Sequence, residues 1–231
     1  MQCSNELRSR IEANLKSLDV INGDENGAFT GKSAAVALIV VELGYGADLK
    51  DLPQYRNWQN DAAILLTRRA LTLRLHPGQW ALPGGRIDTE EDAISAARRE
   101  AKEEIDLDLP STSLMGRLDD FVTRSGFLMR PLVFWGGKAT NLHANPDEVA
   151  SIHRIPVSEL MREDAPILNH DEICNDASAN DEPGSPVLRM PVGQSWIAAP
   201  TAAILYQFRE VAILGKATRV AHFEQPEFAW K

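Results

Sequence analysis

Three glutamates share one side of a predicted helix over residues 89–105, and this feature constrains the chain most. Glu100, Glu103 and Glu104 stand at i, i+3 and i+4, which places them on one arc of about 100°. Apolar side chains at positions 94, 97, 101 and 105 form the buried stripe of the same helix. Carboxylates this close repel one another, and a hard cation such as Mg²⁺ or Mn²⁺ relieves that repulsion. A solvated acidic face gives the same local pattern, so the three glutamates alone leave both interpretations open.

Composition limits the class of protein. A chain of 231 residues with 44% apolar content is long enough for one globular domain with its own core. The net charge of −9 argues against a general nucleic-acid binder. Cys3 and Cys174 form neither a disulfide framework nor a zinc-ligand pattern, and the longest apolar run, residues 34–41, is too short for a bilayer. We therefore expect a cytoplasmic protein without membrane or nucleic-acid partners.

Periodicity predicts an α/β fold. Helices are expected where apolar residues recur every three or four positions, and strands where apolar runs are short and β-branched. The expected helices cover residues 4–19, 89–105 and 201–214. The expected strands cover residues 34–42, 62–69, 80–82, 114–122, 128–135 and 149–155, with a hairpin at 187–192 and 194–197. Residues 43–60 and the acidic stretch 163–186 are expected to be loops.

These elements suggest three parts. Residues 1–32 form an N-terminal helix and linker, residues 33–215 the main domain, and residues 216–231 a tail. The tail contains Phe223, Phe228 and Trp230, which we expect to cover an apolar patch on the same chain or on a second subunit. A homodimer is therefore left open.

The glutamates belong to a longer pattern. The spacing of Gly85, Glu91, Arg99, Glu100, Glu103 and Glu104 resembles the box G-x5-E-x7-R-E-U-x-E-E-x-G-U of the Nudix hydrolase family, with Ala101 and Leu107 at the apolar U positions. The resemblance implies an α/β/α sandwich with a mixed sheet and a loop–helix–loop box. Asp106 replaces the second glycine of the box, where a helix often ends in a left-handed residue. We expect this change to affect the helix end more than the chemistry.

The resemblance also implies a reaction. Nudix hydrolases cleave a nucleoside diphosphate linked to another group, and the box holds divalent metal ions against the diphosphate. By position, Glu100, Glu103 and Glu104 would bind the metal, Mg²⁺ or Mn²⁺. Glu91 and Arg99 would brace the box, and Gly84 and Gly85 would bring backbone N–H groups to the substrate.

The general base is left open by the sequence. In this family it is either a glutamate of the box or an acidic residue on a later loop. The box offers Glu103 and Glu104, and the loop before the strand at 149–155 offers Asp147 and Glu148. A solvated residue at a strand entrance explains Glu148 equally well.

The segment before the box narrows the substrate. Residues 65–85 resemble the motif L-L-T-x-R-[S/A]-x3-R-x3-G-x3-F-P-G-G of coenzyme A diphosphatases, except that Leu82 replaces the phenylalanine. The matching residues are Leu65, Leu66, Thr67, Arg69, Ala70, Arg74, Gly78, Pro83, Gly84 and Gly85. The resemblance implies hydrolysis of coenzyme A or its acyl derivatives, with 3′,5′-ADP as one product.

Local charge agrees with a substrate rich in phosphate. Arg68, Arg69, Arg74 and His76 form a basic cluster in an acidic chain, and arginine binds phosphate through its planar fork. Strand alternation puts Arg68 and Arg69 on opposite faces, and we favour Arg69 and Arg74 as substrate ligands because they match the motif. Ion pairs with the surplus carboxylates are the alternative.

Two rival interpretations remain. One is a Nudix diphosphatase for another substrate, such as ADP-ribose, NADH or an oxidised nucleotide. The other is a Nudix-fold binding module without catalysis, which normally comes with lost box glutamates, and none is lost here.

Overall fold

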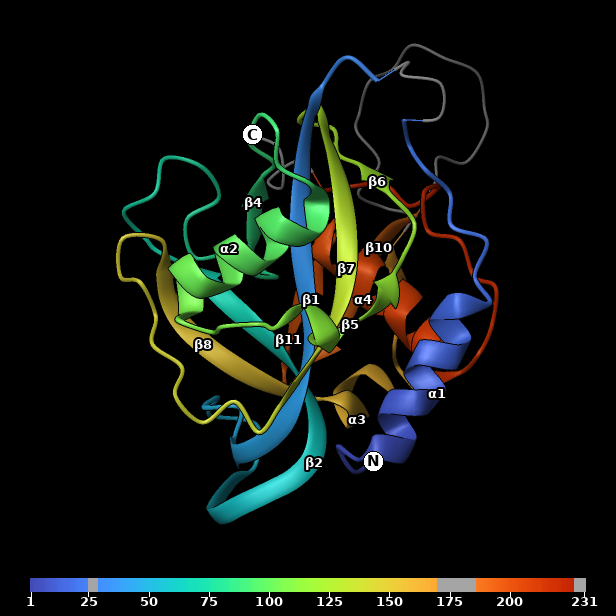
Figure 1. The fold of residues 1–231 in the computed structure, drawn as a ribbon. Coiled ribbons are helices and arrows are strands. Elements are labelled where there is room, and N and C mark those ends of the chain that lie inside the picture. Colours follow the sequence, from blue (N-terminus) through green and yellow to red (C-terminus); the bar gives the residue numbers. More distant parts are fainter. Residues whose placement is uncertain (25–28, 170–185, 227–231) are drawn as a thin grey trace.

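The computed structural model describes residues 1–24, 29–169 and 186–226 of the chain. Its main sheet contains β1 (Lys32–Gly46), β2 (Gln54–Arg69), β3 (Trp80–Ala81), β4 (Gly84–Arg86), β5 (Leu114–Arg117), β6 (Phe121–Val122), β7 (Phe127–Gly137) and β8 (Val149–Pro156). The strand order is β3-β2-β1-β7-β5, while β4 pairs with β1, β6 with β7 and β8 with β2. The central pair β1 and β7 runs parallel and the other pairs are antiparallel, so the sheet is mixed (Figure 1).

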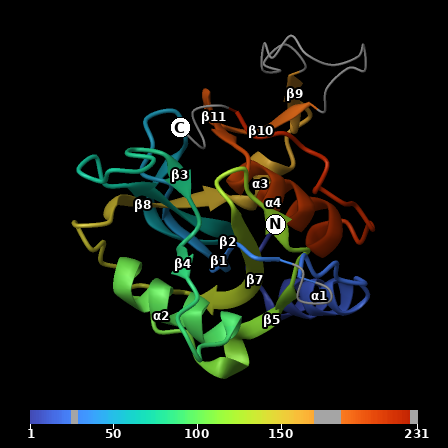
Figure 2. The same cartoon turned by 90° about the horizontal axis from the view of Figure 1, so that it is seen from above.

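Strand β1 divides the interior into two layers. Its side chains are buried on both faces, as a continuous apolar run predicts. Val36, Leu38 and Val40 pack in one apolar cluster, and the alternate residues Ala35, Ala37, Ile39 and Val41 pack in another. Helix α2 (Ala93–Ile105) covers the second cluster, and α1 (Asn5–Lys16) with α4 (Thr201–Gln207) covers the first (Figure 2). The predicted α/β sandwich is confirmed.

Both terminal helices belong to the core. Ser4 caps α1, which buries Leu7, Ile11 and Leu15 as the sequence predicts. Asn14 of α1 donates to the carbonyl of Ala212 at 3.0 Å, within the π-helix Phe208–Ile213 that continues α4. The N-terminal helix is thus an integral part of the apolar layer that also contains the C-terminal helices.

A second, three-stranded sheet lies beside α4. It contains β9 (Ile167–Asn169), β10 (Val187–Val192) and β11 (Ser195–Ala198), of which the last two form the predicted hairpin. The remaining short elements are the 3-10 helix Ser111–Ser113 and α3 (Val157–Leu160). Within the described residues, no helix combines the length and apolar character needed to cross a membrane.

Several predicted boundaries are wrong, and β9 lies inside the segment 163–186 that is expected to be a loop. Only residues 47–53 of the expected loop 43–60 connect strands, because β1 and β2 extend into a long hairpin whose register shifts near Gly44 and Gly46 interrupt the apolar alternation. The strand expected at 114–122 is broken between β5 and β6, where Asp119 and Asp120 accept from the backbone of Ile21 and Gly23. The box helix begins at Ala93 rather than near 89, because Asp92 caps it.

Of the three aromatic residues in the predicted tail, only Phe223 lies within the described residues. Phe223 makes an edge contact with Tyr206 of α4, at 6.0 Å between ring centroids. Phe228 and Trp230 lie outside the described residues. The described part of the tail therefore packs on its own chain.

Candidate active site

Helix α2 presents its glutamates at the edge of the sheet. Asp92 accepts from the backbone N–H of Ser95 at 2.7 Å, and Ala97, Ala101 and Ile105 pack onto the β1 side of the sheet. This packing fixes the rotation of the helix about its axis. It leaves Glu100 and Glu104 at the border of the apolar stripe, facing β4 and the loop before β8.

Three carboxylates converge at this border. One oxygen each from Glu100, Glu104 and Glu148 lies within 4.8 Å of the others. Glu148 reaches the group because the loop before β8 follows the last turn of α2: the N–H of Asn145 donates to the Glu104 carbonyl at 2.9 Å. At the other side, the N–H of Ala70 donates to the Glu148 carbonyl at 2.8 Å. The sequence singled out Glu148, but its contact with Glu100 and Glu104 depends on these loop contacts.

The glycine pair supplies space and a donor. The N–H of Gly84 donates to Oε2 of Glu104 at 3.3 Å. A Cβ at Gly85 would overlap the Glu100 carboxylate, and a Cβ at Gly84 would overlap the carbonyl of Ala35. Only glycine therefore lets β4 lie between β1 and these side chains.

Burial and repulsion disfavour the charged form of Glu104. Its exposed fraction is 6%, and its pKa is raised to about 8, with desolvation as the largest cause. Within that net value, the carboxylates of Glu100 and Glu148 also raise the pKa, whereas the Gly84 N–H and the Arg69 guanidinium lower it. Burial also raises the pKa of Glu100, against the opposing effect of Arg99. A cation at this position would replace the missing solvation.

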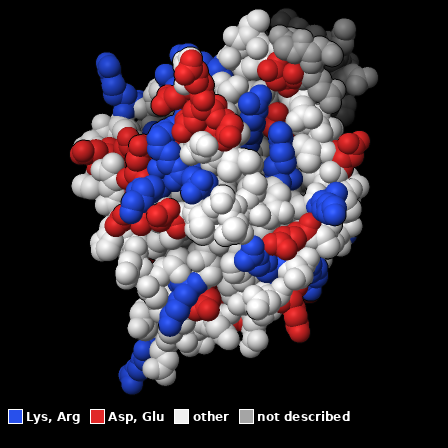
Figure 3. Space-filling view, in the orientation of Figure 1, with Lys and Arg blue, Asp and Glu red and all other residues white. Residues whose placement is uncertain are grey.

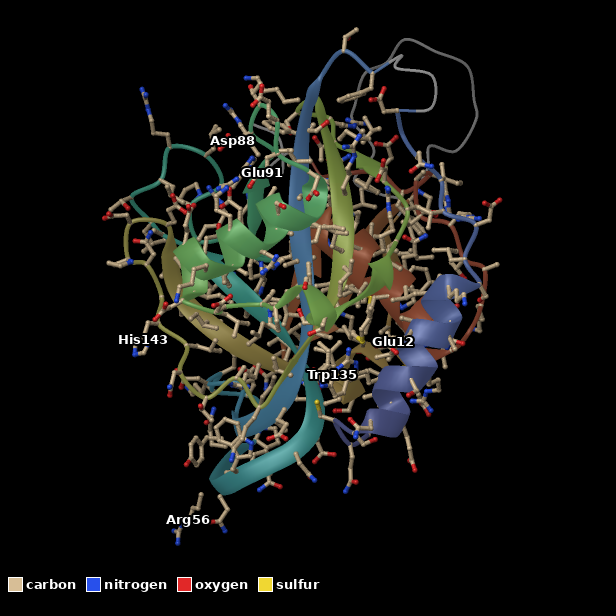
Figure 4. The ribbon with its side chains drawn as sticks, in the orientation of Figure 1. Glu12, Arg56, Asp88, Glu91, Trp135 and His143 are labelled. Atoms are coloured by element: carbon tan, nitrogen blue, oxygen red, sulfur yellow. The ribbon has the colours of Figure 1, made fainter. Side chains whose placement is uncertain are left out.

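Arg99 organises the outer side of the box. It donates to both carboxylate oxygens of Glu91, at 3.1 and 3.0 Å, and to Glu100 at 2.8 Å. It also donates to the carbonyl of Arg86 at 3.0 Å, which ties α2 to β4. Figure 4 shows Asp88 and Glu91 beside the start of α2, and Figure 3 shows acidic and basic side chains interleaved over the helix.

Glu103 lies apart from the converging carboxylates. The sequence grouped it with Glu100 and Glu104, but its carboxylate accepts from Arg99 at 3.2 Å and is 55% exposed. The described structure groups Glu148 rather than Glu103 with Glu100 and Glu104, and metal binding by Glu103 stays a prediction. Helical spacing places the three glutamates of α2 on a shared arc. Side-chain rotamers and the position of the loop before β8 decide which carboxylate oxygens lie close together.

Asp106 ends the helix as expected. It adopts the left-handed conformation with φ 55° and ψ 30°, the conformation that the family's glycine takes without strain. Its carboxylate accepts from Lys102 at 2.5 Å and lies 3.4 Å from His143. The helix therefore ends at Ile105, directly before Asp106.

A cavity of about 210 Å³ adjoins the glycine pair. Arg69 and His76 line it from the segment before the box, together with Leu82, which takes the place of the motif's phenylalanine. Residues from distant segments complete the wall, among them Thr123, Thr201 and Gln225. Sequence patterns gave no signal for these three. Arg74 is exposed and does not line this cavity.

The donor set suits a hard divalent cation. Carboxylate oxygens are the ligands that Mg²⁺ and Mn²⁺ prefer, and the group offers three of them with two largely buried. The cavity beside Gly84 leaves room for a phosphate-bearing ligand next to the carboxylates. The residues present therefore fit the metal that the box implies.

A family model described as NUDIX domain matches residues 56–173, about half of the chain. The chain belongs to the Nudix family. Its sequence is 41% identical over 99 residues to an uncharacterized Nudix hydrolase NudL of Photorhabdus laumondii, covering 42% of this chain and 53% of that protein. The NudL of Cronobacter sakazakii is 39% identical over 103 residues, covering 44% and 54%. The chain thus spans about half the length of the curated relatives that it matches.

A solved structure supports the fold. A MutT/nudix family protein from Enterococcus faecalis superposes with a TM-score of 0.50 at 16% identity, covering 80% of this chain and 63% of that one. The match extends the Nudix fold beyond the sequence-matched segment.

Proposed function

We propose that this Nudix protein is a metal-dependent diphosphatase of coenzyme A or its derivatives. The products would be 3′,5′-ADP and 4′-phosphopantetheine, or the acylated phosphopantetheine when an acyl derivative is the substrate. The observation that carries the proposal is the convergence of Glu100, Glu104 and Glu148 against Gly84, beside a cavity lined by Arg69. The motif over residues 65–85 supports the choice of coenzyme A.

Each residue has an assigned task. Glu100 and Glu104 would hold Mg²⁺ or Mn²⁺ from the protein side, and Glu103 would join them only by leaving Arg99. The bound ion would neutralise charge on the diphosphate and acidify a water. Gly84 and Gly85 would line the diphosphate position, and the Arg69 and Arg74 guanidinium groups would bind phosphate oxygens.

The hydrolytic step needs one base. Water attacks phosphorus, a new O–P bond forms, the bridging P–O bond breaks, and the leaving phosphate carries away the electron pair. A carboxylate takes the proton of the water. We assign this task to Glu148, because it is exposed in the group whereas Glu104 is buried. Glu104 and Glu103 are the competing candidates.

A substrate panel tests the reaction. Coenzyme A, ADP-ribose, NADH and 8-oxo-dGTP are each incubated with Mg²⁺ or Mn²⁺, and the products are read by mass. Metal-dependent release of 3′,5′-ADP from coenzyme A supports the proposal. Turnover of another substrate alone would keep the Nudix chemistry and discard coenzyme A, and inactivity on the whole panel would favour a binding module.

Conservative variants test the assigned tasks. Glu148→Gln should lower kcat at saturating metal by about 100-fold or more, since one proton acceptor is lost. Glu104→Gln should weaken metal binding, measured by titration calorimetry with Mn²⁺. If Glu103→Gln rather than Glu148→Gln removes turnover at saturating metal, the base has been assigned wrongly.

A further inference from the structure

Consecutive arginines on β2 line two different cavities. Arg69 lines the cavity beside the glycine pair, and Arg68 lines a second cavity of about 350 Å³. The two side chains line different cavities, although a register shift against β8 between Arg68 and Arg69 interrupts the regular strand alternation there. The cavities are neighbours, because Gln79, Pro200 and Thr201 line both of them. A ligand that is longer than one cavity would have to reach past these shared residues to occupy both cavities.

Arg68 is a desolvated cation without a carboxylate partner in the described part of the chain. Its guanidinium lies 3.8 Å from the centroid of the Trp80 ring, and Nη1 donates to the carbonyl of Gly78 at 2.9 Å. Burial lowers its pKa, and no acidic side chain opposes that shift. In a chain with a net charge of −9, a guanidinium left without an acidic neighbour is available to an anionic ligand.

A partly exposed indole also lines this cavity. Trp196 belongs to β11, lines the cavity and is 38% exposed. The guanidinium of Arg189 lies 4.0 Å from the centroid of its ring. Exposed indoles stack on nucleobases whatever the base, and each stack contributes measurably to binding. The cavity therefore contains a guanidinium that can bind phosphate and an indole on which a flat ring can stack.

We propose that the second cavity binds the 3′-phosphorylated adenosine end of the substrate. Arg68 would bind the 3′-phosphate and Trp196 would stack on the adenine, while the diphosphate lies at the carboxylates beside Arg69. This inference rests on the proposed function. It assigns to the second cavity the selection of coenzyme A over ADP-ribose and NADH, which lack the 3′-phosphate. Trp196 lies outside the matched segment 56–173, so this wall comes from the chain's own C-terminal hairpin.

Kinetics with and without the 3′-phosphate test the role of Arg68. Arg68→Gln should raise KM for coenzyme A about 10-fold or more and leave KM for dephospho-coenzyme A unchanged, because one charge-assisted contact is lost. Arg68→Lys should restore part of the preference. Arg56→Gln is the matched control, since Arg56 is exposed on the distant β1–β2 hairpin (Figure 4). An equal rise of KM for both substrates, or loss of the preference in Arg74→Gln instead, would overturn the inference.

A binding measurement separates this inference from the proposed reaction. Titration calorimetry without metal compares 3′,5′-ADP with 5′-AMP on the full chain. The wild type should bind 3′,5′-ADP at least about 10-fold more tightly, Arg68→Gln should abolish the difference, and Trp196→Leu should weaken both ligands. Such binding in a protein that does not hydrolyse coenzyme A would support the cavity and refute the reaction. Hydrolysis of coenzyme A without this preference for 3′,5′-ADP would support the proposed reaction and refute the role of the second cavity.

Discussion

Gly85 leaves the space that the carboxylate of Glu100 occupies. A Cβ at this position would overlap both the carboxyl carbon and Oε1 of Glu100. Gly85, the first glycine of the box, and Glu100 are therefore one steric unit, although they stand fifteen positions apart in the sequence. The relation explains in physical terms why the box begins with glycine.

The steric unit predicts the effect of Gly85→Ala. The added methyl should push Glu100 away from Glu104 and lower the affinity for Mn²⁺ about 10- to 100-fold, with kcat/KM falling in parallel. Circular dichroism should show an unchanged fold. Gly137→Ala is the control, because Gly137 has a positive φ of 60° but its Cβ would have no neighbour closer than 3.7 Å. Equal loss of metal affinity in both variants would contradict the steric explanation.

Arg99 should act on the metal through the glutamates that it holds. Arg99→Gln removes the contacts with Glu91, Glu100 and Glu103, so we expect Mn²⁺ affinity to fall about 10- to 100-fold. Lys102→Gln removes one positive charge from the same helix, where Lys102 forms an ion pair with exposed Asp106, and should change the affinity little. A similar loss in both variants would mean that net charge, rather than positioning, is responsible.

The raised pKa of Glu104 predicts how stability depends on pH in the metal-free protein. Its pKa is about 8 in the folded state, above the ordinary value of 4.5, so folding favours the protonated form. This contribution is complete below the ordinary pKa and is lost as the pH rises through about 8. The charges of Glu100 and Glu148 raise the pKa of Glu104, and the charge of Arg69 lowers it.

Thermal unfolding in EDTA measures this effect. Tm of the wild type should fall between about pH 5 and about pH 8.5, and Glu104→Gln should reduce that fall because the amide stays neutral. Glu103→Gln should behave like the wild type, since Glu103 is exposed. A pH dependence that is identical in wild type and Glu104→Gln would show that other groups cause it.

Asp106→Gly tests the cost of the departure from the box. Glycine adopts the left-handed conformation without strain, so Tm should rise by about 2 °C although the contacts with Lys102 and His143 are lost. Asp106→Asn, which loses the charge but tolerates the same backbone, should stay near the wild type. Turnover should be unchanged in both, and a large loss of turnover would give Asp106 a part in the chemistry.

The sequence by itself predicted the box helix, although not its capped start at Asp92. It also placed the three glutamates on one arc and Ala97, Ala101 and Ile105 in the buried stripe. It also determined the buried strand β1 and the hairpin of β10 and β11. These features depend on local periodicity and on residues that are close in the chain, which is why spacing alone predicts them. The resemblance to the Nudix family rested on the motifs within residues 65–107.

Only the tertiary structure decided which carboxylate oxygens lie close together and which segments line the two cavities. Glu148 joins Glu100 and Glu104 because backbone hydrogen bonds hold its loop against α2 and β2, while Arg99 draws Glu103 away. The long β1–β2 hairpin escaped prediction because its bulges interrupt the alternation that marks a strand. The two cavities combine segments from distant parts of the chain, and packing between such segments leaves no periodic signal in the sequence.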